Sequence, residues 1–412
     1  MANVTDVDGA KIAHQQYVSS GKLEPELLRA PVFRAWERSH LEGASARRAK
    51  ALQLDSLEKE RLLEEQVAVI EAAKPYMQAL SKAAGVDAHA AMLGDSRAIV
   101  LDVMGDEQSV HGPVCVPGPG ALLSEGMCGA NGIGSPLAEG GYVELVGPEH
   151  FIEGFHPFTC QGVPFRTPEG DIAGTISISV KKPEAGRRLR EILFCAARGI
   201  EIEMTRAKLA QEIEQAVASP MMAMMDEALV HDLRQDILQS PSVSRLSVEL
   251  AAQKLASAGP RLEPALRLLD LALRSMESFR KQSALFRELV STEKGKKEPI
   301  SLDTLVRDMV MLLQTEARAA NITIDTSASM DTVIVEADRR ETSRAVFRTL
   351  LGWMEQARGG GSLRVIVRNT EDGRGELLVD LYRSTDPTRQ GGTRCFSLKM
   401  PLATMRLAAR DT

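Results

Sequence analysis

Residues 172–218 read IAGTISISVKKPEAGRRLREILFCAARGIEIEMTRAKLAQEIEQAVA, and the pattern of apolar residues changes once within this stretch. At its start, Ile172, Ile176 and Ile178 are interleaved with small or polar residues, which predicts an antiparallel β-strand with one buried face. Further on, no proline occurs over 187–218, so a continuous helix is permitted. We therefore expect a sheet-containing domain to end here and a connecting helix of about thirty residues to follow it.

The part of the chain before this stretch combines helical and β-like patterns. Apolar residues over 24–85 fall at helical steps of three and four. Short β-like runs then appear, separated by clusters of Gly and Pro, at 98–103, 142–146 and 172–180. The sequence therefore predicts a helical segment over 1–85 that leads into an α/β domain over 86–183.

A second helical block lies beyond the connecting helix of 184–219. Its later half carries the most regular apolar repeat in the chain, at Leu262, Leu266, Leu269, Leu273 and Met276. Alternating steps of four and three are typical of a helix that buries one narrow stripe against partner helices. We expect 220–298 to form a helical hairpin that dimerises.

The last region, 299–412, returns to a mixed pattern. It predicts helices and strands in the order of a layered α+β domain, with helices near 302–319 and 340–356 and strands near 322–325, 332–335, 363–368, 376–382 and 394–400. The predicted fold class is therefore multidomain α+β.

Composition and charge exclude several classes of protein. The chain has 412 residues, of which 44% are hydrophobic and 26% charged, as in an ordinary soluble globular protein of several domains. Its formal net charge is −6 and only 4% of its residues are aromatic, so bulk nucleic-acid binding is not expected. One local exception is the basic region from Arg358 onward, where ten Lys and Arg face six Asp and Glu.

Targeting and metal-site signals are missing from the sequence. The first ten residues carry Asp6 and Asp8 without an apolar run, and no window approaches the 18 or so apolar residues of a membrane span. We expect a cytoplasmic protein that makes no membrane contact. The five cysteines are widely spaced and contain no Cys-x-x-Cys pair, which indicates reduced thiols and no bound metal.

His231 is a candidate nucleophile within Leu229-Val230-His231-Asp232-Leu233-Arg234-Gln235. At 100° per residue it lies about 200° from Leu229, so it points away from the apolar face of its helix. An exposed imidazole next to a carboxylate has the groups that a phosphoacceptor needs. A surface histidine without function has the same pattern, and the residues alone leave both interpretations open.

The surroundings of His231 add a resemblance. The run His231-Asp232-Leu233-Arg234, the connector Pro299-Ile300-Ser301-Leu302 and the helix entry Ala337-Asp338 together resemble the dimerisation and ATP-binding modules of sensor histidine kinases. The resemblance covers about 220–401. It implies that His231 is the phosphoacceptor, Asp232 its acidic neighbour, and Gln235 the residue that orients water for phosphatase action. It also implies a four-helix bundle in the dimer, a homodimer as the working state, and a response-regulator receiver domain as the partner.

The nucleotide site departs from that family. Active members carry two asparagines on a helix of the ATP domain, where an amide oxygen coordinates magnesium. Here Thr349 and Trp353 stand at those positions, and an indole has no metal-binding oxygen. The chain also passes from Arg383 to Gly391 without room for the glycine-rich lid. We therefore expect a truncated ATP-binding-like α/β sandwich that has lost ATP and magnesium, and hence no cofactor.

The front half resembles a second family. Its motifs include Trp36-Glu37-Arg38-Ser39, Gly129-Ala130-Asn131-Gly132-Ile133-Gly134, Glu149-His150-Phe151 and Thr159-Cys160. Together they resemble the GAF sensory domain of enhancer-binding activators of the acetoin-regulator type, over about 31–204. The resemblance implies a GAF-like α/β sensor that binds a small molecule. Its candidate pocket residues are Glu125, Asn131, His150 and Cys160. The residues themselves favour loop-structuring roles for these four positions over contacts with a ligand.

Combined, these resemblances imply a cytoplasmic signal-transduction protein. The primary interpretation is a degenerate histidine kinase whose GAF sensor regulates a response-regulator pathway by binding, phosphotransfer or phosphatase action. One alternative is an active sensor histidine kinase with an atypical ATP site. A second alternative is a GAF-containing transcriptional regulator that uses the basic region after Arg358.

Overall fold

The computed structural model describes residues 7–217, 235, 238–239, 241–257, 262–291, 295–327, 332–357, 360–370, 374–382 and 393–401. The chain divides into two units, of which the first comprises Met1–Lys208 with Ser240–Phe279 and the second Leu209–Gln239 with Arg280–Thr412. Helices α8 (Pro183–Val217) and α11 (Glu263–Val290) contribute to both units. α8 confirms the predicted connecting helix. Among the described helices, none has the length and apolarity required to cross a membrane.

The first unit is built on a five-stranded antiparallel sheet with the strand order β3-β2-β7-β6-β5. Its strands are β2 (His89–Asp95), β3 (Val100–Gly105), β5 (Val143–Val146), β6 (Thr159–Arg166) and β7 (Ile172–Val180). The three predicted β-like runs become β3, β5 and β7. The sequence pattern misses β2 and most of β6 because these strands are buried on both faces and so show no alternation of apolar and polar residues.

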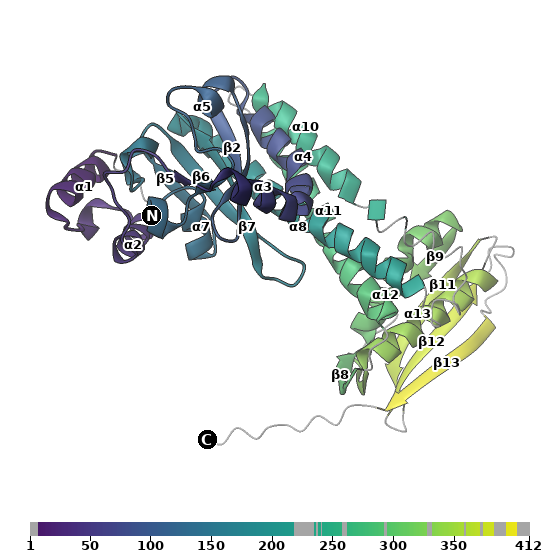
Figure 1. Ribbon diagram of the computed structural model, residues 1–412. Coiled ribbons are helices and arrows are strands. Elements are labelled where there is room, and N and C mark those ends of the chain that lie inside the picture. Colours follow the sequence, from purple (N-terminus) through teal and green to yellow (C-terminus); the bar gives the residue numbers. More distant parts are fainter. Residues whose placement is uncertain are drawn as a thin grey trace, which may run out of the picture. The chain divides into compact units, whose positions relative to one another are not determined.

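Strand β7 differs from the prediction in one respect. It is antiparallel, as expected, but every residue from Gly174 to Val180 is buried, so the prediction of a single buried face is wrong. The physical reason is that both faces of the sheet are covered: α4 and α8 lie on one side, and α2 and α7 lie on the other (Figure 1). The small polar residues of β7 therefore face a second buried layer rather than solvent.

The helices that precede the sheet share a core with it. They are α1 (Val7–Ser20), η1 (Pro25–Leu27), α2 (Ala30–Leu41), α3 (Ser56–Glu65) and α4 (Val67–Ala84). α3 begins with a capping box in which Asp55 and Glu58 satisfy each other's backbone amides. Trp36 of α2 is completely buried, and its indole nitrogen donates to the Glu149 carbonyl at 2.7 Å. The expected helical segment is thus broken between α2 and α3 and belongs to the same core as the strands.

Short elements connect the strands on the side of the sheet that carries α2. They are β1 (Leu52–Gln53), α5 (Glu107–His111), β4 (Ala121–Leu122), α6 (Glu125–Cys128), α7 (Gly134–Glu139), η2 (Gly147–Glu149) and η3 (Glu153–Phe155). β1 pairs with β4 in an antiparallel bridge. Several glycines lie in these connections, and Gly129 has φ +65°, which favours glycine at that position.

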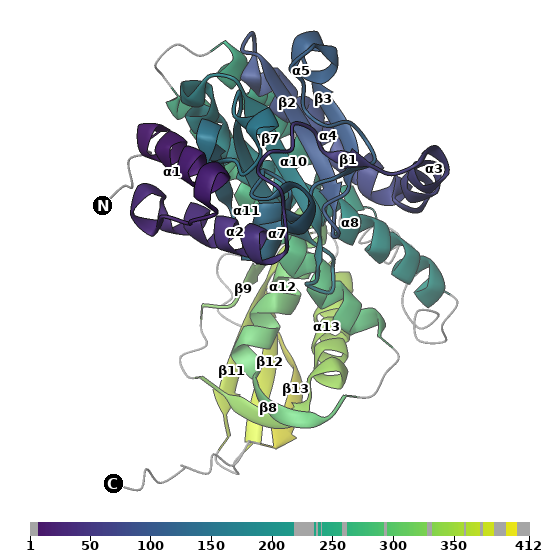
Figure 2. The same ribbon diagram turned by 60° about the vertical axis from the view of Figure 1, so that its left-hand side comes forward.

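Within the first unit, α10 (Pro241–Ala256) packs against α4 (Figure 2). Small residues such as Ser244, Ala251 and Ala252 form its buried face, so the two helices can approach closely. In α11 the buried stripe runs through Ala265, Leu269, Ala272, Met276 and Phe279.

The predicted apolar seam of α11 is therefore only half buried within the chain. Leu269 and Met276 lie in the buried stripe, but Leu266 and Leu273 keep 39% and 37% of their surface exposed. The reason is that the stripe is set by partners in the same chain, where the Cys195 thiol of α8 contacts the Leu269 carbonyl at 3.7 Å. Leu269 therefore lies on the inner face of α11, whereas Leu266 and Leu273 lie on its outer face.

The second unit contains a four-stranded sheet with the order β13-β12-β11-β9, and a separate β8–β10 pair. Its elements are β8 (Lys297–Ser301), α12 (Leu302–Ala319), β9 (Ile322–Asp325), β10 (Ile334–Asp338), α13 (Arg339–Gln356), β11 (Gly361–Asn369), β12 (Arg374–Tyr382) and β13 (Thr393–Pro401). α12 and α13 cover one face of the sheet (Figure 2). All seven predicted helices and strands of this region are confirmed, and β8 is the addition.

Candidate functional site

A small cavity lies between the sheet of the first unit and the loops that cover it. Its wall contains Met92 of β2, Cys160 of β6, and Ser177 and Ser179 of β7. The covering loops add Val116, Pro117, Leu123, Asn131, Gly132, Ile133, Phe155 and Phe158. The free volume is about 20 Å³, enough for one water molecule. None of these side chains is charged, so the cavity suits a neutral group.

Three polar side chains from the sheet face this cavity. The Cys160 thiol and the Ser179 hydroxyl lie 3.0 Å apart and form a hydrogen bond. The Ser177 hydroxyl is buried and has no hydrogen-bond partner among the described residues. A buried hydroxyl without a partner is costly, so Ser177 is the group in this wall that a ligand would satisfy. Gly132 makes room here, since a Cβ at that position would lie 2.7 Å from the Cβ of Cys160.

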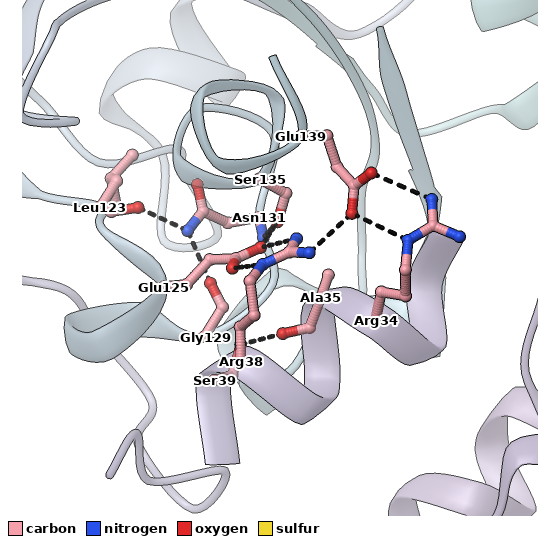
Figure 3. Close-up of polar contacts among 10 residues, drawn as sticks. All are labelled: Arg34, Ala35, Arg38, Ser39, Leu123, Glu125, Gly129, Asn131, Ser135 and Glu139. Atoms are coloured by element: carbon pink, nitrogen blue, oxygen red, sulfur yellow. Dashed lines mark hydrogen bonds and ion pairs between the residues drawn. The ribbon is translucent and has the colours of Figure 1, made fainter. Parts of the chain in front are cut away.

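Asn131 shapes the loop that covers the cavity. Its amide nitrogen donates to the carbonyls of Leu123 and Gly129, each at 2.7 Å (Figure 3). Its amide oxygen accepts from the backbone amides of Ile133 and Gly134. All its polar atoms are therefore engaged with the backbone. Asn131 lines the cavity, but its amide holds the loop in place rather than being free for a ligand.

Behind this loop, Glu125 is buried, with 4% of its surface exposed. Arg38 of α2 binds both of its carboxylate oxygens, at 2.6 and 3.0 Å, and Ser135 donates a third hydrogen bond at 2.6 Å (Figure 3). Arg38 also reaches Glu139 at 2.7 Å, which in turn pairs with Arg34. This network ties α2 to α6 and α7, the helices on either side of the Asn131 loop.

The same architecture has known relatives. Residues 5–203 match the family described as MimR, N-terminal domain. The front part of the chain is therefore similar to that domain. Similar curated proteins include a signal-transduction and transcriptional-control protein of Clostridium beijerinckii, 26% identical over 37% of this chain and 24% of its own length. The acetoin dehydrogenase operon activator AcoR of Bacillus subtilis is 26% identical over 48% of this chain and 33% of its own.

A third relative is the propane 2-monooxygenase operon activator MimR of Mycolicibacterium smegmatis, 25% identical over 50% of this chain and 35% of its own length. The chain thus spans about a quarter to a third of these relatives. Among solved structures, the E. coli DhaR(N)–DhaL complex is similar with 17% sequence identity. The match covers 46% of this chain and 65% of that chain, and its TM-score is 0.41. The complex of histidine kinase ThkA with response regulator TrrA is similar with 15% sequence identity. The match covers 54% of this chain and 58% of that chain, and its TM-score is 0.20.

The first unit also contains a cluster of histidines. His150 is fully buried; its Nδ1 lies 2.9 Å from the Gly147 carbonyl, and its Nε2 has no partner among the described residues. The Nε2 of His156 lies 3.2 Å from the His150 carbonyl, and His14 stacks edge-on against His156. Burial lowers the pKa of His150 and of His156 to about 4, so both rings are neutral at pH 7.

The four predicted pocket residues therefore take different places in this domain. Asn131 and Cys160 line the cavity, whereas Glu125 and His150 are not among its lining residues. Glu125 supports the covering loop through Arg38, and His150 holds the turn at Gly147. Ser177 was not among the predicted pocket residues. In β7, Ser177 and Ser179 alternate with isoleucines. Because both faces of β7 are buried, this alternation places the two serines together on one buried face.

Three of the four cysteines with a described environment, Cys128, Cys160 and Cys195, are buried. Burial raises the pKa of Cys128 to about 11 and that of Cys160 and Cys195 to about 12, so these thiols stay protonated. Cys115 is exposed. Among the described residues, no group of three or more His, Cys, Asp or Glu side chains could hold a metal ion.

The predicted phosphotransfer box is only partly visible. His231 and Asp232 lie outside the described residues, and Gln235 is helical and exposed. On α13, the Thr349 hydroxyl donates to the Ala345 carbonyl at 2.8 Å, and Trp353 is buried with 6% of its surface exposed. Thr349 is thus bonded to the backbone of its own helix, and Trp353 is packed in the core of the second unit.

Proposed function

We propose that the chain is a cytoplasmic signal-transduction protein whose MimR N-terminal domain binds a small, neutral molecule. The observation that carries this proposal is the uncharged cavity whose wall presents the unpartnered hydroxyl of Ser177. An apolar pocket with a few polar groups is the usual form of a small-molecule site. Because the free volume holds one water molecule, a larger ligand displaces the covering loops, for example at Phe155 or Val116.

Two of the relatives support a small ligand, since their names refer to operons for acetoin dehydrogenase and propane 2-monooxygenase. Acetoin and 2-propanol each combine a short apolar body with a hydroxyl group that can bond to Ser177. A carboxylate would be buried without a counter-charge in this wall, which costs far more than a neutral polar group. We therefore expect acetoin or 2-propanol to bind and acetate to be rejected.

The test is a calorimetric titration of the full chain with acetoin, 2-propanol and acetate. Saturable binding of a neutral ligand, with an affinity at least about tenfold lower in Ser177→Ala, supports the proposal. A tenfold loss of affinity equals about 1.4 kcal/mol, which is a typical contribution of one hydrogen bond. Ser109→Ala is a matched control, since its hydroxyl is also buried without a partner but does not line the cavity. Equal loss in both variants would contradict the assignment of the site.

The cavity is coupled to the connecting helix through its own strands. β6 and β7 carry the polar wall, and the residues that join them contact α8. The Arg166 backbone amide donates to Glu201 at 2.9 Å, and Glu169 forms an ion pair with Lys208. A ligand that shifts β6 against β7 therefore changes the position of α8. The ligand can shift the equilibrium between two positions of α8 only by the difference between its binding free energies for these two positions.

For the output we propose a homodimer formed by the helical hairpin. The outward apolar side chains support it: Val243, Leu246 and Leu250 on α10 lie at steps of three and four, and Leu266 and Leu273 on α11 are seven apart. Sedimentation of the full chain tests this state. A dimer that dissociates in Leu246→Glu but persists in Val86→Glu, an equally apolar exposed position on a loop, is the expected result.

We further propose that the dimer binds a response-regulator receiver domain around His231 and has no autokinase activity. The support is the engagement of Thr349 and Trp353 in the second unit's own structure, where a magnesium anchor is needed. Incubation with radiolabelled ATP and magnesium tests it. Label that appears on the wild type and vanishes in His231→Ala would establish the alternative, an active histidine kinase.

A transcriptional regulator is the second candidate, and the relatives favour it. Two are named as transcriptional activators and the third as a transcriptional-control protein. The MimR N-terminal domain would then act on DNA through other parts of the chain, such as the basic region after Arg358. Binding of duplex DNA that weakens steeply with salt, and more so after removal of that region, would support it.

A further inference from the structure

A second hollow lies in the first unit, between α4 and α10. Helix α4 contributes Pro75, Tyr76, Gln78, Ala79 and Lys82 to its wall, and α10 contributes Arg245, Val248 and Glu249. Its volume is about 310 Å³, far more than the cavity beside Ser177. Its wall is also much more polar. The hollow is a separate site, because it shares no residue with that cavity.

The geometry of the two helices explains why the hollow exists. At one end they touch: a Cβ at Gly85, which follows α4, would lie 3.2 Å from the carbonyl oxygen of Ala256 at the end of α10. Farther from this contact, the segments from Pro75 to Lys82 and from Arg245 to Glu249 line the hollow. The ammonium of Lys82 and the carboxylate of Glu249 lie 4.0 Å apart across this gap.

Tyr76 forms part of the wall of the hollow. The side chain is 1% exposed, and its hydroxyl has no hydrogen-bond partner among the described residues. Burial raises the pKa of Tyr76, so the hydroxyl keeps its proton and can only be satisfied by an acceptor or a water molecule. The ring is held against α8, because Gly199 has no side chain at the point where the ring packs.

Three charged side chains act on the Tyr76 hydroxyl. The negative charge of Glu203 acts most strongly, followed by the positive charges of Arg245 and Arg206. Arg206 and Glu203 neutralise each other at 2.8 Å, and Lys82 is opposed by Glu249. Arg245 makes no hydrogen bond or ion pair with any residue in the described part of the chain, and so remains an uncompensated cation at the hollow.

We propose that this hollow is a binding site for a small oxyanion, a phosphate or carboxylate group, held by the Arg245 guanidinium and the Tyr76 hydroxyl. A guanidinium binds two oxygens of such a group in parallel, and a phenol donates to a third or to a shared oxygen. The anion links the sensor helix α4 to the hairpin helix α10 and stabilises their contact. This proposal stands independently of the ligand at Ser177.

The experiment is a calorimetric titration of the full chain with inorganic phosphate and, separately, with acetate, at ionic strength held constant with sodium chloride. We expect saturable binding of at least one anion, weakened at least tenfold in Arg245→Gln and in Tyr76→Phe. The matched control is Lys254→Gln, which removes an exposed cation of the same helix outside the hollow and leaves the affinity unchanged.

The two arms separate the sources of the oxyanion: preference for phosphate indicates a phosphorylated ligand, and preference for acetate a carboxylate. Three results would overturn the proposal. They are the absence of saturable heat with both anions, equal affinities in Arg245→Gln and Lys254→Gln, and full affinity in Tyr76→Phe. Arg245 is exposed, so its variant folds and the comparison stays interpretable. Slower amide exchange in α10 with bound anion is expected as well, because the anion joins α10 to α4.

Discussion

Arg38 binds both carboxylate oxygens of Glu125, at 2.6 and 3.0 Å, although the two residues are 87 positions apart in the chain. Glu125 is buried, and a buried carboxylate is stable only when it is paired and hydrogen-bonded. This ion pair anchors α2 to the helices beside the loop of Asn131. The Arg38 in the Trp36–Ser39 motif is therefore a support for the ligand cavity rather than part of its wall.

Replacement of Arg38 by Met tests this support. Arg38→Met keeps the length of the side chain but leaves Glu125 buried without a counter-charge, so we expect unfolding free energy to fall by about 3–5 kcal/mol. Arg34→Met is the control, because Arg34 pairs with Glu139 at the surface and its loss changes the urea midpoint little. Similar midpoints for the two variants would contradict the role of Arg38.

The buried histidines predict how stability depends on pH. Their folded pKa of about 4 lies below the unfolded value of about 6.5, so the unfolded chain takes up protons first as the pH falls. Stability is therefore lost between pH 6.5 and pH 4. For His150 alone the loss between pH 7.5 and 5.5 is about 1 kcal/mol.

Thermal unfolding at pH 7.5, 6.5 and 5.5 measures this dependence. His156→Gln removes one of the two groups, so its transition temperature should fall less with pH than that of the wild type. His111→Gln replaces an exposed histidine and should keep the wild-type slope. An unchanged slope in His156→Gln would rule out the histidine cluster as its source.

The thiols should differ sharply in reactivity. Because the thiolate is the nucleophile and burial keeps Cys128, Cys160 and Cys195 protonated, iodoacetamide at pH 7.5 should modify the exposed Cys115 at least about tenfold faster. Mass spectrometry of timed digests measures each rate. In urea the four rates should converge. Fast labelling of Cys160 in the folded protein would show that the cavity opens to solvent.

Two helical glycines should respond in opposite ways to alanine. A Cβ at Gly199 of α8 would overlap the ring of Tyr76, so Gly199→Ala should cost about 1–3 kcal/mol although alanine favours the helix. At Gly352 of α13 nothing lies within 4 Å of the added atom, so Gly352→Ala should gain up to about 1 kcal/mol. Urea unfolding measures both, with one tryptophan, Trp36 or Trp353, reporting on each unit. A neutral Gly199→Ala would disprove the close packing of Tyr76.

Much of the local structure follows from the sequence pattern. The predicted bounds of α12 and β9 are those of the structure, and α8 begins one residue before the predicted connecting helix of 184–219. Such elements have one buried and one exposed face, so their periodicity is visible. Strands β2 and β6 lack that contrast because both faces are buried, and the pattern therefore misses them.

The candidate site was less predictable. Asn131 and Cys160 could be named because their motifs are distinctive, and they do line the cavity. Ser177 could not, since its importance depends on a second buried layer above β7. Glu125 was assigned to the pocket, but its partner Arg38 holds it behind the covering loop.

The sequence by itself determined the order and type of most helices and strands, and the presence of Thr349 and Trp353 at the positions where the resemblance to histidine kinases implies two asparagines. Only the tertiary structure decided which leucines of α11 turn inward, which carboxylate Arg38 neutralises and where Tyr76 lacks a partner. The reason is physical. The periodicity of apolar residues in the sequence indicates which face of a helix or strand is buried. Contacts between side chains that are tens of residues apart depend on how whole helices and strands pack against each other.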